Sequence, residues 1–209
     1  MTADTTAPVP PGAGIDELKT AATQCRACEL WKAATQVVFS AGNPAAPMML
    51  VGEQPGDVED RKGVPFVGPA GTLLQRALAD AGLAVSDVYV TNAVKHFRFT
   101  VRGKRRIHAT PLMSHIKACR PWLEAELRTV EPQLIVCLGA TAAKALLGTG
   151  FRVTESRGQV LELETPVGVR RVLATVHPSS VLRAVDDERD AAYAGLVADL
   201  STAAAGIKP

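Results

Sequence analysis

The chain has 209 residues, of which 47% are hydrophobic and 21% charged, and its formal net charge is +2. These values are typical of one globular domain with a sizeable core. No apolar run approaches the roughly 20 residues of a membrane span, and residues 1–14 lack the basic start and apolar core of a secretory signal. We therefore expect a flexible tail over residues 1–14, a single domain over residues 15–209, and a cytoplasmic monomer.

Predicted strands and helices alternate along the chain. Short apolar runs that end in glycine are typical of buried parallel strands, and helical apolar spacing that stops at glycine is typical of helices. In chain order we expect a helix or helical turn at 15–31, a strand at 47–52, a helix at 71–81, a strand at 88–91, a helix at 114–130, a strand at 133–138, a helix ending at 147, a strand pair at 159–163 and 169–176, and a helix at 186–203. The alternation predicts an α/β fold, a three-layer α/β/α sandwich with a mostly parallel central sheet.

Three polar motifs follow predicted strands. They read GEQPGD (52–57), TNAVKH (91–96) and HPSS (177–180). Ligands of open parallel sheets bind beyond the carboxyl ends of the strands. We therefore expect the three motifs to form one site at that edge of the sheet.

A basic segment lies between Val88 and Leu123. It contains no Asp or Glu, although it holds eight Lys and Arg residues and three of the four histidines. A solvated surface would normally intersperse acidic residues. Such a concentration of positive charge attracts polyanions, and nucleic acid is the first candidate.

The cysteines suggest a metal site. Cys25-x-x-Cys28 alone could be a zinc knuckle, a redox pair, half of a cluster site or two unrelated thiols. Cys119 is a good third ligand and His96 the best fourth, whereas Cys137 in the middle of a strand behaves as a small hydrophobe. Both tetrahedral zinc and an iron–sulfur cluster accept Cys and His, so spacing does not choose between them.

Several separated segments resemble one family in the expected order. They are VFSAGNPAAPMMLVGEQPGDVEDRKGVPFVGPAG, VYVTNAVKH, LIVCLGATAAKALLG and VHPSSVLR. Together they resemble the uracil-DNA glycosylase superfamily, specifically its iron–sulfur family-four branch. Two departures resemble the UdgX type: His96 replaces a family-four cysteine, and KRRIH (104–108) is inserted before Cys119. UdgX-type proteins resemble glycosylases but become covalently attached to DNA through the loop histidine.

The resemblance implies a structural [4Fe-4S] cluster held by Cys25, Cys28, His96 and Cys119 rather than zinc. It implies uracil-containing DNA as the partner and uracil as the released base. Single-stranded DNA is favoured, because a uracil inside a duplex must first be flipped out.

Three residues would form the base pocket. Phe66 would stack on uracil, although from spacing alone it could be a core residue. Asn92 can donate and accept, so it could bond O4 and N3–H of uracil, a pattern that cytosine does not satisfy; otherwise it is a turn residue. His177 would donate to O2 as charge gathers on the leaving base, and its alternative is to cap a helix or turn.

Three further residues come from GEQPGD. Gln54 is expected to line the pocket, mainly through its main chain. Asp57 is expected at the substrate or in solvent. Glu53 is expected near the sugar, where it orients the nucleophile and stabilises the oxocarbenium-like centre, although it too could be a solvated acid.

His108 is the predicted nucleophile. By default, a loop histidine among cations contacts phosphate or solvent. Arg105 and Arg106 are expected to favour its neutral form, whose free nitrogen could capture the sugar cation after uracil leaves. This predicts a single-turnover reaction in which the product stays on the protein.

Six residues are expected to contact DNA phosphates: Lys104, Arg105, Arg106, Ser179, Ser180 and Arg183. Arg106 could instead position the loop. Two other functions stay open, a conventional glycosylase that turns over and a cluster-containing DNA-binding module without chemistry.

Overall fold

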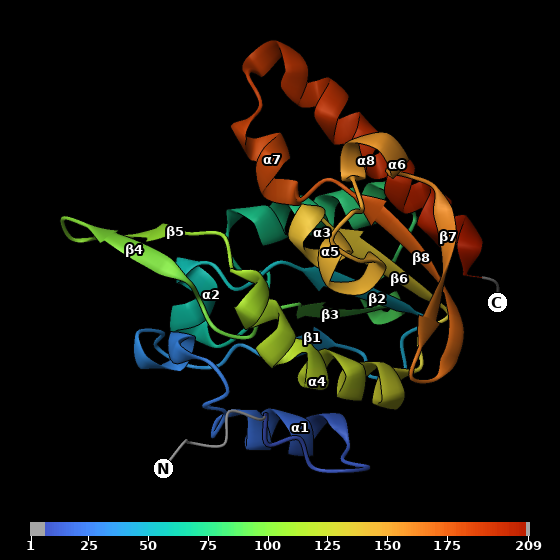
Figure 1. Ribbon diagram of the computed structural model, residues 1–209. Coiled ribbons are helices and arrows are strands. Elements are labelled where there is room, and N and C mark those ends of the chain that lie inside the picture. The colour runs from blue at the N-terminus through green and yellow to red at the C-terminus, as the bar shows by residue number, and fades with distance from the viewer. Residues whose placement is uncertain (1–6, 208–209) are drawn as a thin grey trace.

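The computed structural model describes residues 7–207 and contains one six-stranded sheet between two helical layers (Figure 1). Its strands, in spatial order, are β1 (Ser40–Gly42), β3 (Val88–Asn92), β2 (Met48–Gly52), β6 (Leu134–Leu138), β8 (Gly168–Thr175) and β7 (Val160–Thr165). The four inner strands are parallel, and the two edge strands are antiparallel to their neighbours. The predicted α/β/α sandwich is thereby confirmed.

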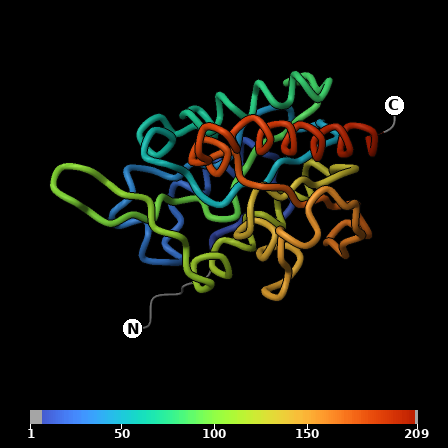
Figure 2. The backbone as a smooth tube through the Cα atoms, turned by 90° about the horizontal axis from the view of Figure 1, so that it is seen from above, coloured from blue at the N-terminus to red at the C-terminus, as the bar shows by residue number. Residues whose placement is uncertain are grey.

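The helices cover both faces of the sheet. They are α1 (Ile15–Ala22), α2 (Asp57–Lys62), α3 (Pro69–Asp80), α4 (Met113–Val130), α5 (Ala140–Leu147), α6 (Val153–Ser156), α7 (Pro178–Arg183) and α8 (Asp186–Gly206), with 3-10 turns at Glu29–Lys32 and Val85–Asp87. Figure 2 shows α3 and α8 side by side along one face. Helices α1, α4 and α5 pack on the opposite face.

Alternating residues of the buried strands pack into two hydrophobic cores, one on each face of the sheet. Met49 and Val51 of β2 pack with the core on the α1/α4 side, whereas Met48 and Leu50 pack with the core on the α3/α8 side. Side chains of a strand point alternately to its two faces, so a strand buried on both sides is apolar throughout. Cys137 of β6 lies fully buried in the first of these cores, as predicted.

The prediction of a helix over 15–31 is wrong in its second half. Helix α1 ends at Ala22, and both Cys25 and Cys28 lie in the irregular segment that follows. There the Thr23 hydroxyl donates to the Thr20 carbonyl, and Arg26 donates to the carbonyls of residues 23 and 25. These side-chain bonds take the place of helical ones.

The basic loop before His108 is in fact a hairpin. Strand β4 (Phe99–Arg102) pairs with β5 (Arg105–His108) in an antiparallel ribbon that projects from the body (Figure 1). Gly103 has φ +60° at the two-residue turn, as tight hairpin turns require. The predicted loop histidine therefore ends a strand.

The predicted tail falls partly outside the described residues, since it includes residues 1–6. Of the remainder, Ala7 is buried in the core, with Val9 and Ala13 packed against it. The domain boundary at residue 14 stays a prediction. Among residues 7–207, no helix has both the length and the apolar character needed to cross a membrane.

Candidate active site

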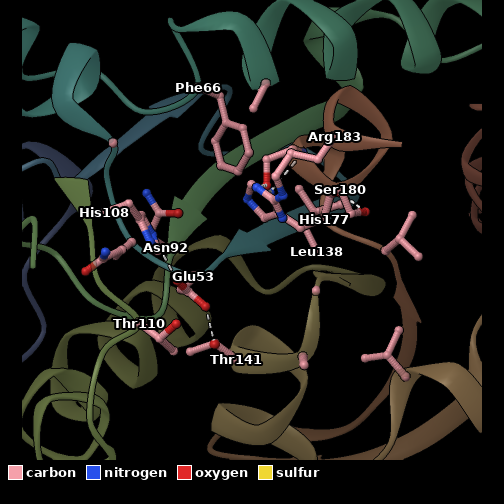
Figure 3. Close-up of a pocket in the computed structure, with 18 of the residues that line it drawn as sticks. Glu53, Phe66, Asn92, His108, Thr110, Leu138, Thr141, His177, Ser180 and Arg183 are labelled. Carbon is pink, nitrogen blue, oxygen red and sulfur yellow. Dashed lines mark hydrogen bonds and ion pairs between the residues drawn. The ribbon is translucent and has the colours of Figure 1, made fainter. Parts of the chain in front are cut away.

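A cavity of about 740 Å³ opens at the carboxyl ends of the parallel strands. Residues from all three polar motifs line it, which is where the order of the strands predicts a ligand site. Figure 3 shows Phe66, Asn92, His108 and His177 arranged around this space. Of the residues expected to act in catalysis or base binding, all but Asp57 line it.

At one end of the cavity, the Phe66 ring and the Asn92 side-chain amide both lie close to Gly52. A Cβ at Gly52 would lie 2.3 Å from Asn92 Oδ1 and 2.6 Å from Phe66 Cζ, so only glycine leaves this space open. Phe66 itself has φ +55°. Asn92 Oδ1 is buried and has no hydrogen-bond partner among the described residues. A buried acceptor without a partner is costly, and Asn92 lines the cavity in which a ligand could supply the donor.

The backbone of Asn92 is held by the buried ion pair of Lys95 and Glu126. Lys95 Nζ bonds to Glu126, donates to the Asn92 carbonyl at 3.0 Å and lies 2.6 Å from Thr91 Oγ1. Tyr89 also donates to Glu126. Losing one partner of a buried pair leaves an uncompensated charge, so the pair fixes the end of β3 in place.

His177 caps helix α7 and still faces the cavity. Its Nδ1 accepts from the Ser179 backbone N–H at 3.1 Å, and the Ser179 hydroxyl is held by Arg183 at 3.0 Å. The proton of the neutral ring therefore lies on Nε2. Burial lowers the pKa of His177 to about 4, although nearby Glu53 opposes this. Its ring lies 6.1 Å from that of Phe66, with 29° between the planes. The capping alternative is thus confirmed, and it leaves an N–H for a ligand.

Glu53 joins the hairpin to the sheet. Its Oε1 lies 3.0 Å from His108 Nε2, and its Oε2 accepts a hydrogen bond from the Thr141 hydroxyl (Figure 3). Burial would raise the pKa of Glu53, but the bonds from His108 and Thr141 outweigh it, so the net pKa is lowered. Glu53 is therefore a carboxylate at neutral pH, and it holds the imidazole of a half-exposed His108.

Gln54 fastens the base of the hairpin. Its amide donates to the carbonyls of Arg98 and Ala109, both at 3.1 Å, and accepts from the Arg98 N–H at 2.9 Å. These residues lie just before β4 and just after β5. The side chain of Gln54 is thus committed to the hairpin, and Gln54 lines the cavity without a free amide.

Arg106 clamps the hairpin to helix α2. It forms ion pairs with Asp57 at 2.5 Å and with fully buried Asp60 at 2.6 Å, and it lies over the rings of Phe97 and Phe99. Its side chain is only 15% exposed. Asp57 and Arg106 are therefore bonded to each other, and Asp57 does not line the cavity as a substrate-binding residue would. For Arg106, this pairing agrees with the alternative that it positions the loop.

The other residues expected to contact DNA lie in two places. Lys104 and Arg105 are exposed at the tip of the hairpin. Ser179, Ser180 and Arg183 line the cavity mouth on the opposite side, on helix α7. The two groups flank the cavity.

Three of the proposed cluster ligands, the cysteines, meet at helix α4. Cys28 packs against the small core cluster that includes buried Cys119, and the Trp122 indole donates to Cys25 Sγ at 3.3 Å. Burial, with smaller contributions from the thiols of Cys28 and Cys25, raises the pKa of the Cys119 thiol to about 12. The three thiols are thus neighbours.

The fourth expected ligand, His96, is a buried neutral imidazole, because burial, with a smaller effect of the nearby Arg26, lowers its pKa to about 4. Within residues 7–207, no three ligands converge on one point as a single metal ion requires. Each ligand of a four-iron cluster binds a different iron, so the four ligands surround the cluster instead of meeting at one metal ion. By their chemistry, three thiols and an imidazole fit such a cluster.

Two residues of the site were missed from the sequence. Thr141 is the second residue of α5, which begins after Gly139, and a threonine near a helix start is normally explained by the local structure of that helix end. Asp60 lies in DVED, which resembles a solvated acidic turn, yet it is fully buried. Neither position carries a local pattern that indicates its partner.

Comparison with known proteins agrees with this geometry. Residues 39–201 match the uracil DNA glycosylase superfamily. The chain is 36% identical over 172 residues to a type-4 uracil-DNA glycosylase of Archaeoglobus fulgidus, covering 80% of this chain and 83% of that protein. It is 37% identical over 161 residues to the type-4 enzyme of Thermotoga maritima, covering 77% and 79%. The chain therefore belongs to the uracil DNA glycosylase superfamily, and its relatives include type-4 enzymes.

Proposed function

We propose that the protein excises uracil from DNA and then becomes covalently linked to the abasic sugar through His108. The excision rests on membership of the superfamily and on the names of the type-4 relatives. The observation that carries the covalent step is the 3.0 Å contact between His108 Nε2 and Glu53 Oε1 at the cavity wall. In support, this contact brings an imidazole and a carboxylate together at the wall of the cavity, where we propose that the sugar lies.

The base is recognised at the Gly52 end of the cavity. Uracil presents an N3–H donor to Asn92 Oδ1, which has no partner within residues 7–207, while O4 accepts from the Asn92 amide. Cytosine has an acceptor at N3 and a donor at N4, so both contacts would be mismatched. Phe66 stacks on the ring. Asn92 and Phe66 thus select uracil by its edge and its face.

His177 stabilises the leaving base. As the C1′–N1 bond breaks, the electron pair moves onto uracil, and negative charge gathers on O2. The Nε2–H of neutral His177 donates to that oxygen. A neutral donor suits this role because burial disfavours an imidazolium here.

Glu53 and His108 act on the sugar. The carboxylate stabilises positive charge at C1′ while uracil departs. His108 Nε2 then bonds to C1′, and its proton passes to Glu53 and on to the released uracil anion or solvent. One C–N bond breaks, one C–N bond forms, and no redox partner is needed. A conventional glycosylase would use water in place of the imidazole.

The hairpin holds this nucleophile in place. Gln54 fixes both ends of the ribbon, and the pair of Arg106 with Asp60 fixes its middle. Lys104 and Arg105 at the tip, with the serines and Arg183 of α7, contact phosphates on either side of an unpaired nucleotide.

Cys25, Cys28, His96 and Cys119 would hold a [4Fe-4S] cluster. The cluster would supply a structural cross-link between the segment after α1, the end of β3 and helix α4. In support, the three thiols are neighbours, and the backbone of Lys95, the residue before His96, hydrogen-bonds to Cys119. Iron and sulfide analysis of the purified protein tests this assignment; a colourless protein with one zinc would contradict it.

A denaturing gel of uracil-containing single-stranded DNA incubated with the protein tests the whole proposal. We expect a protein–DNA band that survives heat and detergent. His108→Ala should lose this band and release abasic DNA instead, because excision does not need the imidazole. Released abasic DNA from the wild type would indicate a conventional glycosylase, and unchanged DNA a binding module. An undiminished band in the variant would exclude His108 as the nucleophile.

A further inference from the structure

We propose that Thr141 is a positioning residue for covalent capture, because its hydroxyl fixes the Glu53 carboxylate in the orientation that serves His108. The inference rests on the proposed function and deepens it. No residue on α5 was expected to take part in the reaction.

The two oxygens of Glu53 have separate partners. Oε2 accepts from Thr141 Oγ1, and Oε1 contacts His108 Nε2 at 3.0 Å. With one oxygen held by a residue of the protein body, the carboxylate cannot turn about its terminal bond without losing that hydrogen bond. Thr141 thereby decides which oxygen faces the nucleophile.

The position of Thr141 is itself tightly fixed. It is the second residue of α5, and its side chain is almost fully buried. The preceding turn depends on Gly139, whose φ is +92° and whose Cβ, if present, would lie 2.9 Å from His177 Cβ. The same turn therefore sets both the Glu53 anchor and the backbone beside His177.

The charges around Glu53 agree with a carboxylate held for proton acceptance. The groups that face it are His108 from β5, His177 from the start of α7 and the Thr141 hydroxyl from α5. Burial raises the pKa of Glu53, and the two side-chain hydrogen bonds more than offset this. A carboxylate beside the first turn of α5 also benefits from the positive end of the helix dipole.

Removing the hydroxyl should affect capture more than excision. Without Thr141, Glu53 loses a charge-assisted hydrogen bond, so its pKa rises and it can rotate away from His108. The donor on His177 and the acceptor on Asn92 are untouched, so uracil still leaves. Water then competes better for the sugar cation, and the ratio of adduct to free abasic DNA falls.

Thr141→Val and Thr141→Ser test this in the cluster-loaded protein. Valine keeps the branched shape without the hydroxyl, and serine restores it. Single-turnover reactions with a uracil-containing oligonucleotide are quenched over time from pH 4 to 8, and adduct and free abasic DNA are measured separately. We expect Thr141→Val to form adduct about tenfold more slowly than the wild type. The pH below which the rate of adduct formation falls should be about one unit higher than in the wild type. Thr141→Ser should behave like the wild type.

The result that would overturn the inference is a Thr141→Val protein with the rate, product ratio and pH profile of the wild type. Thermal melting shows whether the valine variant is folded; should it be unfolded, Thr141→Ala is measured with the same expectations. A wild-type protein that forms no adduct would instead refute the proposed function, so the two failures are distinct.

Discussion

His177 offers the sharpest test of the leaving-group chemistry. His177→Ala removes the Nε2–H that the neutral imidazole presents to the cavity. Removing one preorganised donor to a developing oxyanion typically costs about 10²–10³ in rate, or about 2.7–4 kcal/mol. We expect a loss of uracil excision in this range, and adduct formation should fall with it because capture follows excision.

The same substitution also removes a helix cap, and that effect needs its own control. Nδ1 of His177 accepts from the Ser179 N–H, and losing such a cap costs about 1 kcal/mol of folding free energy. His177→Asn keeps a good capping residue, but its shorter side chain does not carry an N–H to the position of Nε2. It should melt near the wild type and still lose excision.

The pH dependence gives a second measurement on the same residue. Burial lowers the pKa of His177 to about 4, so the ring is neutral at every pH above that value and the Nε2–H stays in place. The single-turnover excision rate should therefore be flat between pH 5 and 8. A rate that falls as pH rises through about 6.5 would mean that a cationic imidazole is required. A His177→Ala rate within fivefold of the wild type would equally refute the role.

Two further predictions concern the pocket and the hairpin. Gly52→Ala should keep the fold, since the new Cβ meets only side-chain atoms, but it fills the base space and should lower single-turnover excision about a hundredfold; excision at the wild-type rate would place the base elsewhere. Lys104→Ala with Arg105→Ala should weaken binding to uracil-free single-stranded DNA and reduce the slope of log affinity against log salt by about 1.4, which is about 0.7 for each phosphate that the variant no longer neutralises. An unchanged slope would show that the hairpin tip lies away from the DNA.

The sheet and the place of the site could be predicted from the sequence because both depend on local patterns. The apolar runs before Gly52 and Gly139 indicate buried parallel strands, and the polar residues after such strands meet at one edge. The core position of Cys137 followed from its place in the middle of such an apolar run. Glu53, Asn92 and His177 were placed correctly in the cavity for this reason.

The contacts that position those residues could not be predicted because they join distant segments. Nothing near Asp57 indicates that it pairs with Arg106 rather than with substrate, and nothing near Gln54 indicates the hairpin base. The hairpin did have a local signal, since Phe99–Arg102 and Arg105–His108 flank a Gly-Lys turn. The segment was nevertheless expected to be a loop because of its high density of positive charge. Thr141 was missed because a helix-start threonine has an adequate local explanation.

The central claim is that His108 bonds to the sugar that uracil leaves. Protease digestion of the isolated protein–DNA adduct, followed by tandem mass spectrometry, tests it most directly. We expect the mass of the abasic sugar with its remaining nucleotide on the peptide that contains His108, and fragment ions that assign it to that residue. A sugar linked to any other residue, or a protein recovered without added mass, would contradict it.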